Sequence, residues 1–176
     1  FEITKVVSVI PGGVSGQDSI YKGLCAAEEY VTEQNDDNTI VLIHDGVRPL
    51  ITEDTISDNI AKVKECGSCV TTVPAIETVI IDNHDSSFSI PNRSDCMMAR
   101  APQSFYLKDI IGAHRKSRKE GKINFIDSCS LMSFYGHKLG LIQGPMENIK
   151  ITTPADYFVL RAMVEVHENQ QIFGIY

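Results

Sequence analysis

The apolar residues of this chain form short β-type runs that alternate with amphipathic helical segments. Thr39–His44 and Cys69–Val73 are runs of apolar and β-branched residues, which is typical of strands covered on both faces. One stripe of apolar residues at helical spacing begins after Asp18 or Ser19, and another follows Thr52, a residue type favoured at helix N-caps. Alternating strands and helices predict an α/β fold with a mainly parallel sheet flanked by helices.

The rest of the chain extends this pattern and contains one exception. Residues Glu77–Asn92 form two short β-like runs around the polar turn NHDSS, which predicts a β-hairpin within an arm of about residues 77–96. This hairpin has little apolar pattern to bury on a central sheet, so we expect it to pack on a partner subunit. The other elements that we expect are strands at Lys5–Ile10, Met97–Ala101 and Lys138–Gln143 and helices at Leu107–Lys119, at Asp127–Tyr135 and from Thr153 to about Glu168.

Length, composition and charge limit the possible functions. The 176 residues, 43% hydrophobic and 22% charged, suit one globular domain. The net charge of −7 argues against general nucleic-acid binding, but a few placed cations can still bind a small phosphorylated ligand. No apolar run is long enough for a membrane span. The five cysteines are odd in number and irregularly spaced, which is typical of a reduced, cytoplasmic protein.

Cys66 and Cys69 form a C-x-x-C motif, so a thiol redox function is one alternative. A thioredoxin-like pair opens a helix, whereas this pair follows a helical segment and leads into a strand. Zinc would need two more ligands in a similar cluster, and the sequence offers none. We therefore interpret both residues as ordinary half-buried cysteines.

Four segments that follow predicted strands carry groups suited to a phosphorylated ligand, and the first two lie in the first half of the chain. Pro11–Gly16 is glycine-rich and precedes a helix, so its backbone can approach a ligand closely, although such a turn can also be only a turn. Asp45 and Arg48 lie just past a buried strand. Asp45 can hold Mg²⁺ or ligand hydroxyls, and Arg48 can bind phosphate or orient Asp45. The alternative is a structural Asp–Arg pair, with His44 as a packed strand residue.

The other two segments lie in the second half of the chain. One runs from Arg93 to Gln103, and the other is Asn148–Pro154. Lys150 falls between a predicted strand and a capped helix, where a cation suits a nucleotide phosphate. The alternative is a surface lysine whose flanking isoleucines hold its stem.

Taken together, these motifs resemble one family. The GG…DS turn before a helix, HDGVRP, APQSF and ENIKITTPAD occur in the order seen in the 2-C-methyl-D-erythritol 4-phosphate cytidylyltransferases and their relatives, the ribitol-5-phosphate cytidylyltransferases. The resemblance runs from about Lys5 to Arg161, nearly the whole chain. It implies a Rossmann-like nucleotidyltransferase fold with a protruding β-arm that builds a homodimer.

The resemblance also implies a reaction, the transfer of CMP from CTP to a polyol phosphate with release of pyrophosphate, aided by Mg²⁺ on the triphosphate. Asp45 matches the family's Asp at the polyol phosphate, and Lys150 matches its lysine on the phosphates. Thr78 and Arg93 match residues that reach the polyol phosphate of the neighbouring subunit. The positions that match the nucleotide-binding residues are Gly13, Ser19 and Gly46.

Some positions depart from the family pattern near the polyol. Gly16 stands where the family often has Arg, Ala101-Pro102-Gln103 where it often has T-P-Q, and Ile126-Asp127 where a Thr-Asp pair is common. The segments NRSDCMMARAPQSF and ENQQIFG are closer to the ribitol-5-phosphate branch, some members of which carry a C-terminal reductase domain. We therefore expect ribitol 5-phosphate as the acceptor, with methylerythritol phosphate as the alternative.

The family's first strand–helix unit carries a Gly-rich loop with Arg and Lys that hold the triphosphate, and nothing between Phe1 and Tyr176 supplies it. We therefore expect the chain as given to be inactive by itself. The competing hypothesis is a non-catalytic dimerisation or ligand-binding remnant. A G-x-G-x-R…K loop ahead of these residues distinguishes the enzyme from the remnant.

Overall fold

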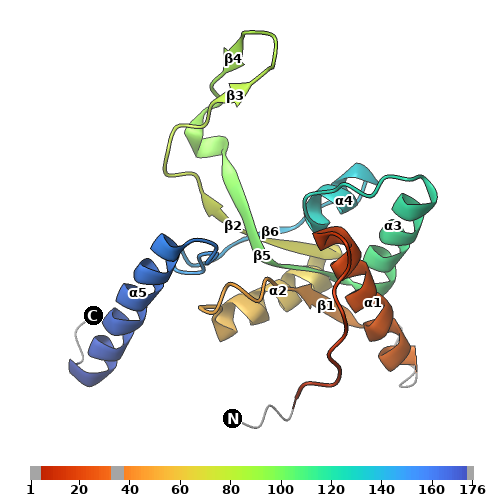
Figure 1. Ribbon diagram of the computed structural model, residues 1–176, viewed down its shortest axis with the longest axis horizontal. Coiled ribbons are helices and arrows are strands. Elements are labelled where there is room, and N and C mark those ends of the chain that lie inside the picture. Colours follow the sequence, from red (N-terminus) through yellow and green to blue (C-terminus); the bar gives the residue numbers. More distant parts are fainter. Residues whose placement is uncertain (1–4, 33–37, 174–176) are drawn as a thin grey trace.

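A four-stranded sheet in the order β1–β5–β2–β6 forms the centre of the computed structural model, which describes residues 5–32 and 38–173 (Figure 1). Its strands are β1 (Ile40–Ile43), β2 (Ser68–Pro74), β5 (Met97–Tyr106) and β6 (Leu141–Gln143). β5 pairs antiparallel with both β1 and β2, and β6 pairs parallel with β2. β1, β2 and β6 therefore run in one direction, which confirms the mainly parallel sheet, with β5 reversed between its neighbours.

Several helix ends show recognisable capping chemistry. They are α1 (Gly16–Thr32), α2 (Glu53–Cys66), α3 (Leu107–Lys119), α4 (Ser128–Phe134) and α5 (Pro154–Phe173). At the start of α2, Thr52 Oγ1 accepts a hydrogen bond from Thr55 N at 3.2 Å. Gly67 ends α2 in the left-handed conformation (φ 90°), which a residue without Cβ adopts at no steric cost. Thr153 and Asp156 form a reciprocal capping box at the start of α5.

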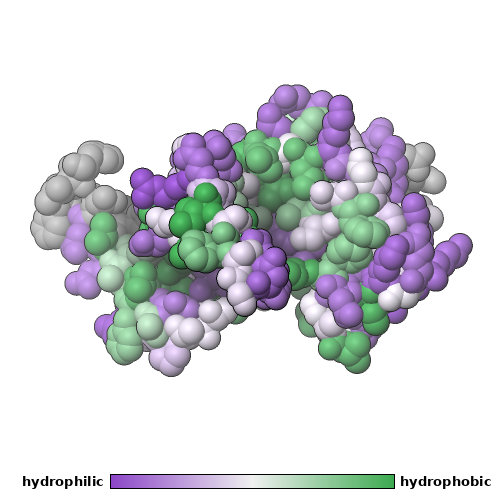
Figure 2. Space-filling model, turned by 90° about the horizontal axis from the view of Figure 1, so that it is seen from above, coloured by the Kyte–Doolittle hydropathy of each residue, from purple (hydrophilic) through white to green (hydrophobic). Residues whose placement is uncertain are grey.

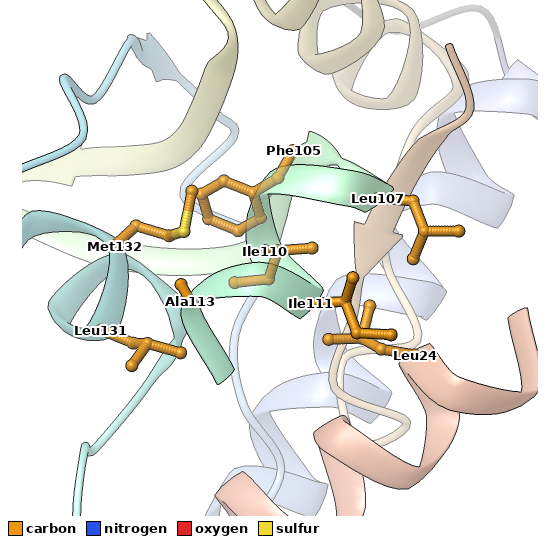
Figure 3. Packing of buried hydrophobic residues seen from close by; sticks show 8 residues of the cluster. All are labelled: Leu24, Phe105, Leu107, Ile110, Ile111, Ala113, Leu131 and Met132. Carbon is orange, nitrogen blue, oxygen red and sulfur yellow. The ribbon is translucent and has the colours of Figure 1, made fainter. Parts of the chain in front are cut away.

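Alternate residues of β5 point to opposite faces of the sheet and hold two different layers. Phe105 faces a hydrophobic core between the sheet, α1, α3 and α4 (Figure 3). The buried members of this core are Leu24, Phe105, Leu107, Ile110, Ile111, Ala113, Leu131 and Met132. The neighbouring Ser104 faces α2 on the other side, where its hydroxyl donates to Asn59 Oδ1 at 2.8 Å. Asn59 in turn donates to Thr71 Oγ1 at 2.9 Å, so a satisfied polar network joins α2 to the sheet.

Two strand predictions are corrected by the structure. Lys5–Ile10 forms no strand, and Val9 is 88% exposed, because the segment runs beside α1, which offers no sheet edge to pair with. The strand predicted at Met97–Ala101 extends to Tyr106 and ends directly at α3. In addition, Ile40–Ile43 are only half-buried rather than covered on both faces.

The arm leaves the sheet between β2 and β5 and projects away from the body (Figure 1). Its tip is the two-stranded sheet of β3 (Ile81–Asp82) and β4 (Phe88–Ser89), which confirms the predicted hairpin. Seen from above, hydrophobic and hydrophilic groups lie side by side over the middle of the molecule, where the arm points toward the viewer (Figure 2). Among the described residues, no helix has the length and apolar character needed to span a membrane.

Candidate functional site

The loops that follow β1 and β6 meet at one edge of the sheet, although these two strands are its outermost ones. Strands that run in one direction bring their carboxyl ends to the same edge, where ligands of open α/β sheets bind. Ile151 N donates to Val47 O at 2.9 Å, and Arg48 Nη1 donates to Asn148 O at 2.8 Å. These bonds join the segment around Asp45 to the segment around Lys150.

Asp45 lies between two cations at this edge. Its Oδ2 accepts a hydrogen bond from Arg48 Nε at 3.0 Å and lies 3.5 Å from Lys150 Nζ. The Lys150 side chain is 48% exposed, so its ammonium group can reach a ligand. The structure therefore brings together the three charged residues that were predicted from these two loops, Asp45, Arg48 and Lys150.

Arg48 differs from Lys150 in burial and in the partners that it contacts. Its side chain is only 10% exposed, and its donors reach Asp45 and the carbonyl of Asn148. His44 Nε2 donates to the backbone O of Arg48 at 3.0 Å, which fixes the turn from the other side. Of the two roles considered for Arg48, the geometry favours orientation of Asp45, and His44 is a packed residue as expected.

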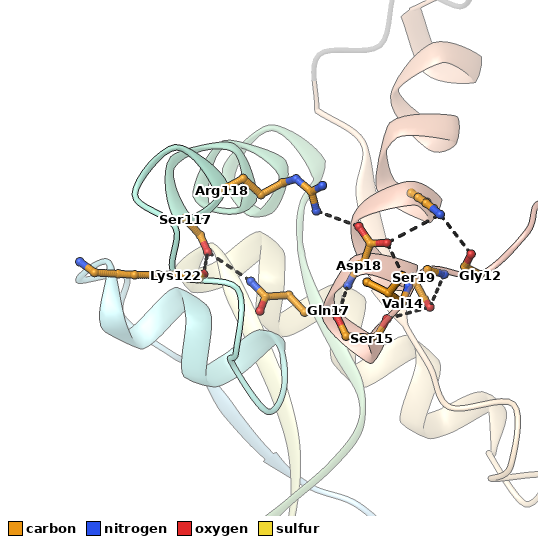
Figure 4. A network of polar contacts seen from close by, with 11 residues as sticks. Gly12, Val14, Ser15, Gln17, Asp18, Ser19, Ser117, Arg118 and Lys122 are labelled. Atoms are coloured by element: carbon orange, nitrogen blue, oxygen red, sulfur yellow. Dashed lines mark hydrogen bonds and ion pairs between the residues drawn. The ribbon is translucent and has the colours of Figure 1, made fainter.

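The glycine-rich turn before α1 uses its own amides internally (Figure 4). Gly13 N donates to Ser19 Oγ at 2.8 Å, and Val14 N donates to Asp18 Oδ2 at 3.2 Å. A Cβ on Gly13 would lie 2.1 Å from Asp18 Oδ2, so only glycine fits there. The hydrogen bond from Arg118, followed by that from Val14, lowers the pKa of Asp18, so a carboxylate occupies this helix N-terminus. The amides of Gly13 and Val14 are therefore already paired and do not face a phosphate as free donors.

A cleft of about 440 Å³ lies between α1 and β1. Ser19 and Leu24 line it from the helix, and Val41 and His44 line it from the strand. Ser19 and His44, the residue before Asp45, are its polar lining side chains, and the others are apolar. Such a cleft, apolar with a few polar groups, is typical of a small-molecule site.

Thr78 and Arg93 lie together at the base of the arm. Both line an open cleft of about 730 Å³ that also includes Pro74 and Ile90. Arg93 Nη1 donates to Ile76 O at 3.3 Å, which holds the two sides of the arm together. Among the described residues, no hydrogen bond or ion pair joins this cleft to Asp45 or Lys150 of the same chain.

The segment from Arg93 to Gln103 differs from its prediction, because it is not a loop beyond a strand. Residues 97–106 are β5 itself, and its reversed direction places its first half at the edge where the other strands end. Arg100 Nη1 therefore reaches the carbonyls of Met146 and Asn148 at 2.8 and 2.9 Å. No pattern in the sequence indicated this contact, since strand direction depends on pairing between distant residues.

The thiol chemistry considered for the C-x-x-C motif is not supported. Cys69 is fully buried, and burial raises the pKa of its thiol to about 12, so the reactive thiolate is not formed near neutral pH. Cys66 is exposed, and its Sγ lies 3.3 Å from the carbonyl O of Ser68. Among the residues placed by the structure, no group of three or more His, Cys, Asp and Glu side chains is arranged to hold a metal ion.

Two residues beside the positions that depart from the family pattern, Gln103 and Asp127, have structural roles here. Gln103 Nε2 donates to Asp127 Oδ2 at 3.0 Å, and Gln103 Oε1 accepts from Cys129 N at 2.8 Å. Asp127 caps α4 through Ser130 N at 2.9 Å. The side chain of Ile126 is 96% exposed and makes no comparable contact.

Comparisons with known proteins agree with this geometry. A family model described as IspD, 2-C-methyl-D-erythritol 4-phosphate cytidylyltransferase, matches residues 2–166. The chain is 50% identical over 175 residues to a ribitol-5-phosphate cytidylyltransferase from Vibrio parahaemolyticus, covering 99% of this chain and 72% of the relative. It is 35% identical over 162 residues to a 2-C-methyl-D-erythritol 4-phosphate cytidylyltransferase from Desulforamulus reducens, covering 92% and 66%.

A solved structure is also similar in fold. The 4-diphosphocytidyl-2C-methyl-D-erythritol synthase of Anaerococcus prevotii superimposes with a TM-score of 0.77 at 27% identity, over 89% of this chain and 69% of that one. Sequence and fold thus agree over most of the chain. This chain therefore belongs to the IspD family of 2-C-methyl-D-erythritol 4-phosphate cytidylyltransferases.

Proposed function

We propose that this protein transfers CMP from CTP to a polyol phosphate and releases pyrophosphate, with ribitol 5-phosphate as the acceptor. The observation that carries the reaction type is the cluster at the sheet edge, where exposed Lys150 lies 3.5 Å from the carboxylate of Asp45. An exposed cation beside a carboxylate that is bound by Arg48 suits a reaction that depends on positioning and on neutralising phosphate charge. Membership of a cytidylyltransferase family supports the same reaction.

In the proposed reaction, an oxygen of the acceptor phosphate attacks the α-phosphorus of CTP in line. The bond from the α-phosphorus to the bridging oxygen breaks, and pyrophosphate leaves with that electron pair. Lys150 donates to phosphate oxygens and offsets the charge that develops on them. Asp45 accepts from Arg48 and is thereby oriented toward the acceptor's hydroxyls or toward the nucleotide's metal.

We propose that the nucleoside lies in the cleft between α1 and β1. Ser19 lines this cleft beside Gly13, and Gly46 lies two residues after His44, which also lines it. The amides of Gly13 and Val14 are already paired with Ser19 and Asp18, which favours the uncharged cytidine at the turn and the triphosphate nearer Lys150.

Mg²⁺ fits this arrangement as an ion carried by the nucleotide. Mg²⁺ is commonly bound through one or two carboxylates together with substrate phosphates. Asp45 is the carboxylate in position for this, because only its Oδ2 is used by Arg48 and Lys150 among the described residues. When bound, the ion would withdraw charge from the phosphate oxygens.

The choice of acceptor is supported by the relatives rather than by the geometry. Identity is 50% to the ribitol-5-phosphate cytidylyltransferase and 35% to the methylerythritol enzyme. Ala101 in place of the family's common Thr also removes a hydroxyl near the polyol end. Methylerythritol phosphate is the second candidate because the matching family model carries its name. A fused C-terminal reductase domain stays a prediction.

We further propose that the arm packs on a second copy of this chain. Its apolar side chains are largely exposed, among them Ile80 at 63%, Phe88 at 67% and Ile90 at 56%. A small two-stranded hairpin is only marginally stable when its apolar side chains face water. In such a dimer, Thr78 and Arg93 would contribute to the partner's acceptor site, which makes the dimer a condition for activity.

Replacing Phe88 with aspartate should convert the dimer into a monomer and reduce activity. A charge buried at the centre of an interface carries a desolvation penalty of a few kcal/mol, enough to weaken association by about 100-fold or more. Sedimentation velocity at micromolar concentration measures the change. Ser86→Asp adds the same charge to the exposed turn and serves as the control. A monomeric wild-type protein, or a Phe88→Asp variant that remains a dimer, would contradict this interface.

The reaction itself is tested by pyrophosphate release from the protein as its gene encodes it. We expect release only when CTP and a polyol phosphate are both present, with one pyrophosphate formed for each CDP-polyol. No release by the encoded protein with any polyol phosphate would leave the non-catalytic remnant as the better explanation.

A further inference from the structure

Arg100 lies in the first half of β5, at the edge of the sheet where the loops after β1 and β6 meet. It is half-buried, and its Nη1 donates to Met146 O at 2.8 Å and to Asn148 O at 2.9 Å. Both carbonyls belong to the loop that carries Lys150. Arg100 therefore binds the backbone of this loop from the side of the sheet.

Asn148 is the point where several of these contacts converge. Its carbonyl also accepts from Arg48 Nη1 at 2.8 Å, so two guanidinium groups share one acceptor. The Asn148 side chain is fully buried, and its Nδ2 donates to Ala101 O at 2.7 Å. Two consecutive residues of β5, Arg100 and Ala101, thus bind Asn148, and the turn after β1 binds it from the opposite direction.

This arrangement has an electrostatic cost. Burial, followed by the like charge of Arg48, lowers the pKa of Arg100. Two cations on one carbonyl repel each other, and a single arginine would be enough to satisfy that oxygen. Arg100 also pairs with Met146 O, so the two guanidinium groups together hold the loop at two carbonyls, Met146 O and Asn148 O, despite their mutual repulsion.

Lys150 belongs to the loop that these two arginines hold. It stands two residues after Asn148 and one residue before Ile151, whose N–H donates to Val47 O at 2.9 Å. Its own side chain is 48% exposed and contacts Asp45 at 3.5 Å. The direction of the Lys150 side chain depends mainly on how firmly its backbone is held at these two points.

We propose that Arg100 is a positioning residue of the active site, which holds the loop of residues 146–151 so that Lys150 reaches the phosphates. This role rests on the proposed function of Lys150. Arg100 acts through the backbone and makes no contact with the reacting groups. A direct contact between Arg100 and the acceptor phosphate is the competing explanation. The two explanations differ in whether the effect of replacing Arg100 depends on the presence of Lys150.

A double-mutant cycle in the pyrophosphate assay distinguishes these explanations. Arg100→Ala alone should lower kcat/KM by about 10- to 100-fold, the size of effect that a small misplacement of a catalytic group produces. In a Lys150→Ala background, the same change should cost less than about threefold, because the residue it positions is already gone. Effects that multiply in the double variant would overturn the positioning role and favour direct contact with substrate.

A second readout does not depend on activity. Hydrogen exchange should become faster for the amides of residues 146–151 in Arg100→Ala, while exchange in α3 stays unchanged. Unchanged exchange in the loop would overturn the proposal. If Arg100→Ala does not fold, Arg100→Gln retains an N–H donor without the charge and takes its place in both measurements. Arg115→Ala, which removes an exposed arginine paired with Glu28, is the matched control and should change neither readout.

The two measurements also separate this proposal from the function on which it rests. An encoded protein without cytidylyl transfer activity would contradict the proposed function, whatever the exchange data show. Faster loop exchange in Arg100→Ala together with unaltered kinetics would contradict the positioning role alone.

Discussion

Lys150→Ala is expected to lower kcat/KM for cytidylyl transfer by about 100- to 1,000-fold, the usual effect of removing one group that stabilises transition-state charge. Lys150 is an exposed cation in the cluster, whereas Arg48 is nearly buried and already bound to Asp45 and Asn148. The loss should appear mainly in kcat, because the charge on the phosphate oxygens develops during transfer. Steady-state kinetics with varied CTP and acceptor measure both parameters.

The folded state should tolerate this substitution. An exposed ion pair such as that between Lys150 and Asp45 contributes at most about 1 kcal/mol, so the thermal midpoint should hardly move. Lys64→Ala on the exposed side of α2 is the control and should leave the kinetics unchanged. A Lys150→Ala variant that keeps more than about a third of wild-type kcat/KM would remove Lys150 from the mechanism.

Phe105→Ala should reduce the free energy of unfolding by about 3–5 kcal/mol, the range observed when a large aromatic side chain is deleted from a packed core. Phe105 is 0% exposed, and it lies beside Ile110 and Met132 in the core of Figure 3. It also lies in β5, between β1 and β2, so no neighbouring element can easily move in to fill the cavity. Urea unfolding measures the change.

An exposed position provides the comparison. Ile126 is 96% exposed, and Ile126→Ala should change the free energy of unfolding by less than about 0.5 kcal/mol. A loss below about 1 kcal/mol for Phe105→Ala would mean that β5 does not pack against α3 and α4 as described.

Local chemistry explains why some elements were predictable from the sequence. The helix expected at Leu107–Lys119 has those bounds, and Thr52 caps α2 as its residue type suggests. Asp45 and Lys150 were selected because each follows a strand, and strands of one direction bring such residues together. These inferences need only the spacing of apolar residues within a segment and the assumption that the predicted strands run in the same direction.

Features that depend on pairing between distant residues were not predictable in this way. Lys5–Ile10 has the residues of a strand, but a strand exists only where a partner edge is available. β5 runs against its neighbours, and this reversal brings Arg100 to the edge that carries Asp45 and Lys150. The internal hydrogen bonds of the glycine-rich turn depend on the rotamers of Asp18 and Ser19, on which a sequence pattern gives no information.

The acceptor is most directly tested by comparing ribitol 5-phosphate with 2-C-methyl-D-erythritol 4-phosphate under identical conditions with the encoded protein and CTP. The two polyols differ in chain length and in the groups that each presents, so a site built for one should reject the other by about tenfold or more in kcat/KM. We predict the higher kcat/KM with ribitol 5-phosphate and CDP-ribitol as the product. A higher kcat/KM with methylerythritol phosphate would contradict the proposed acceptor.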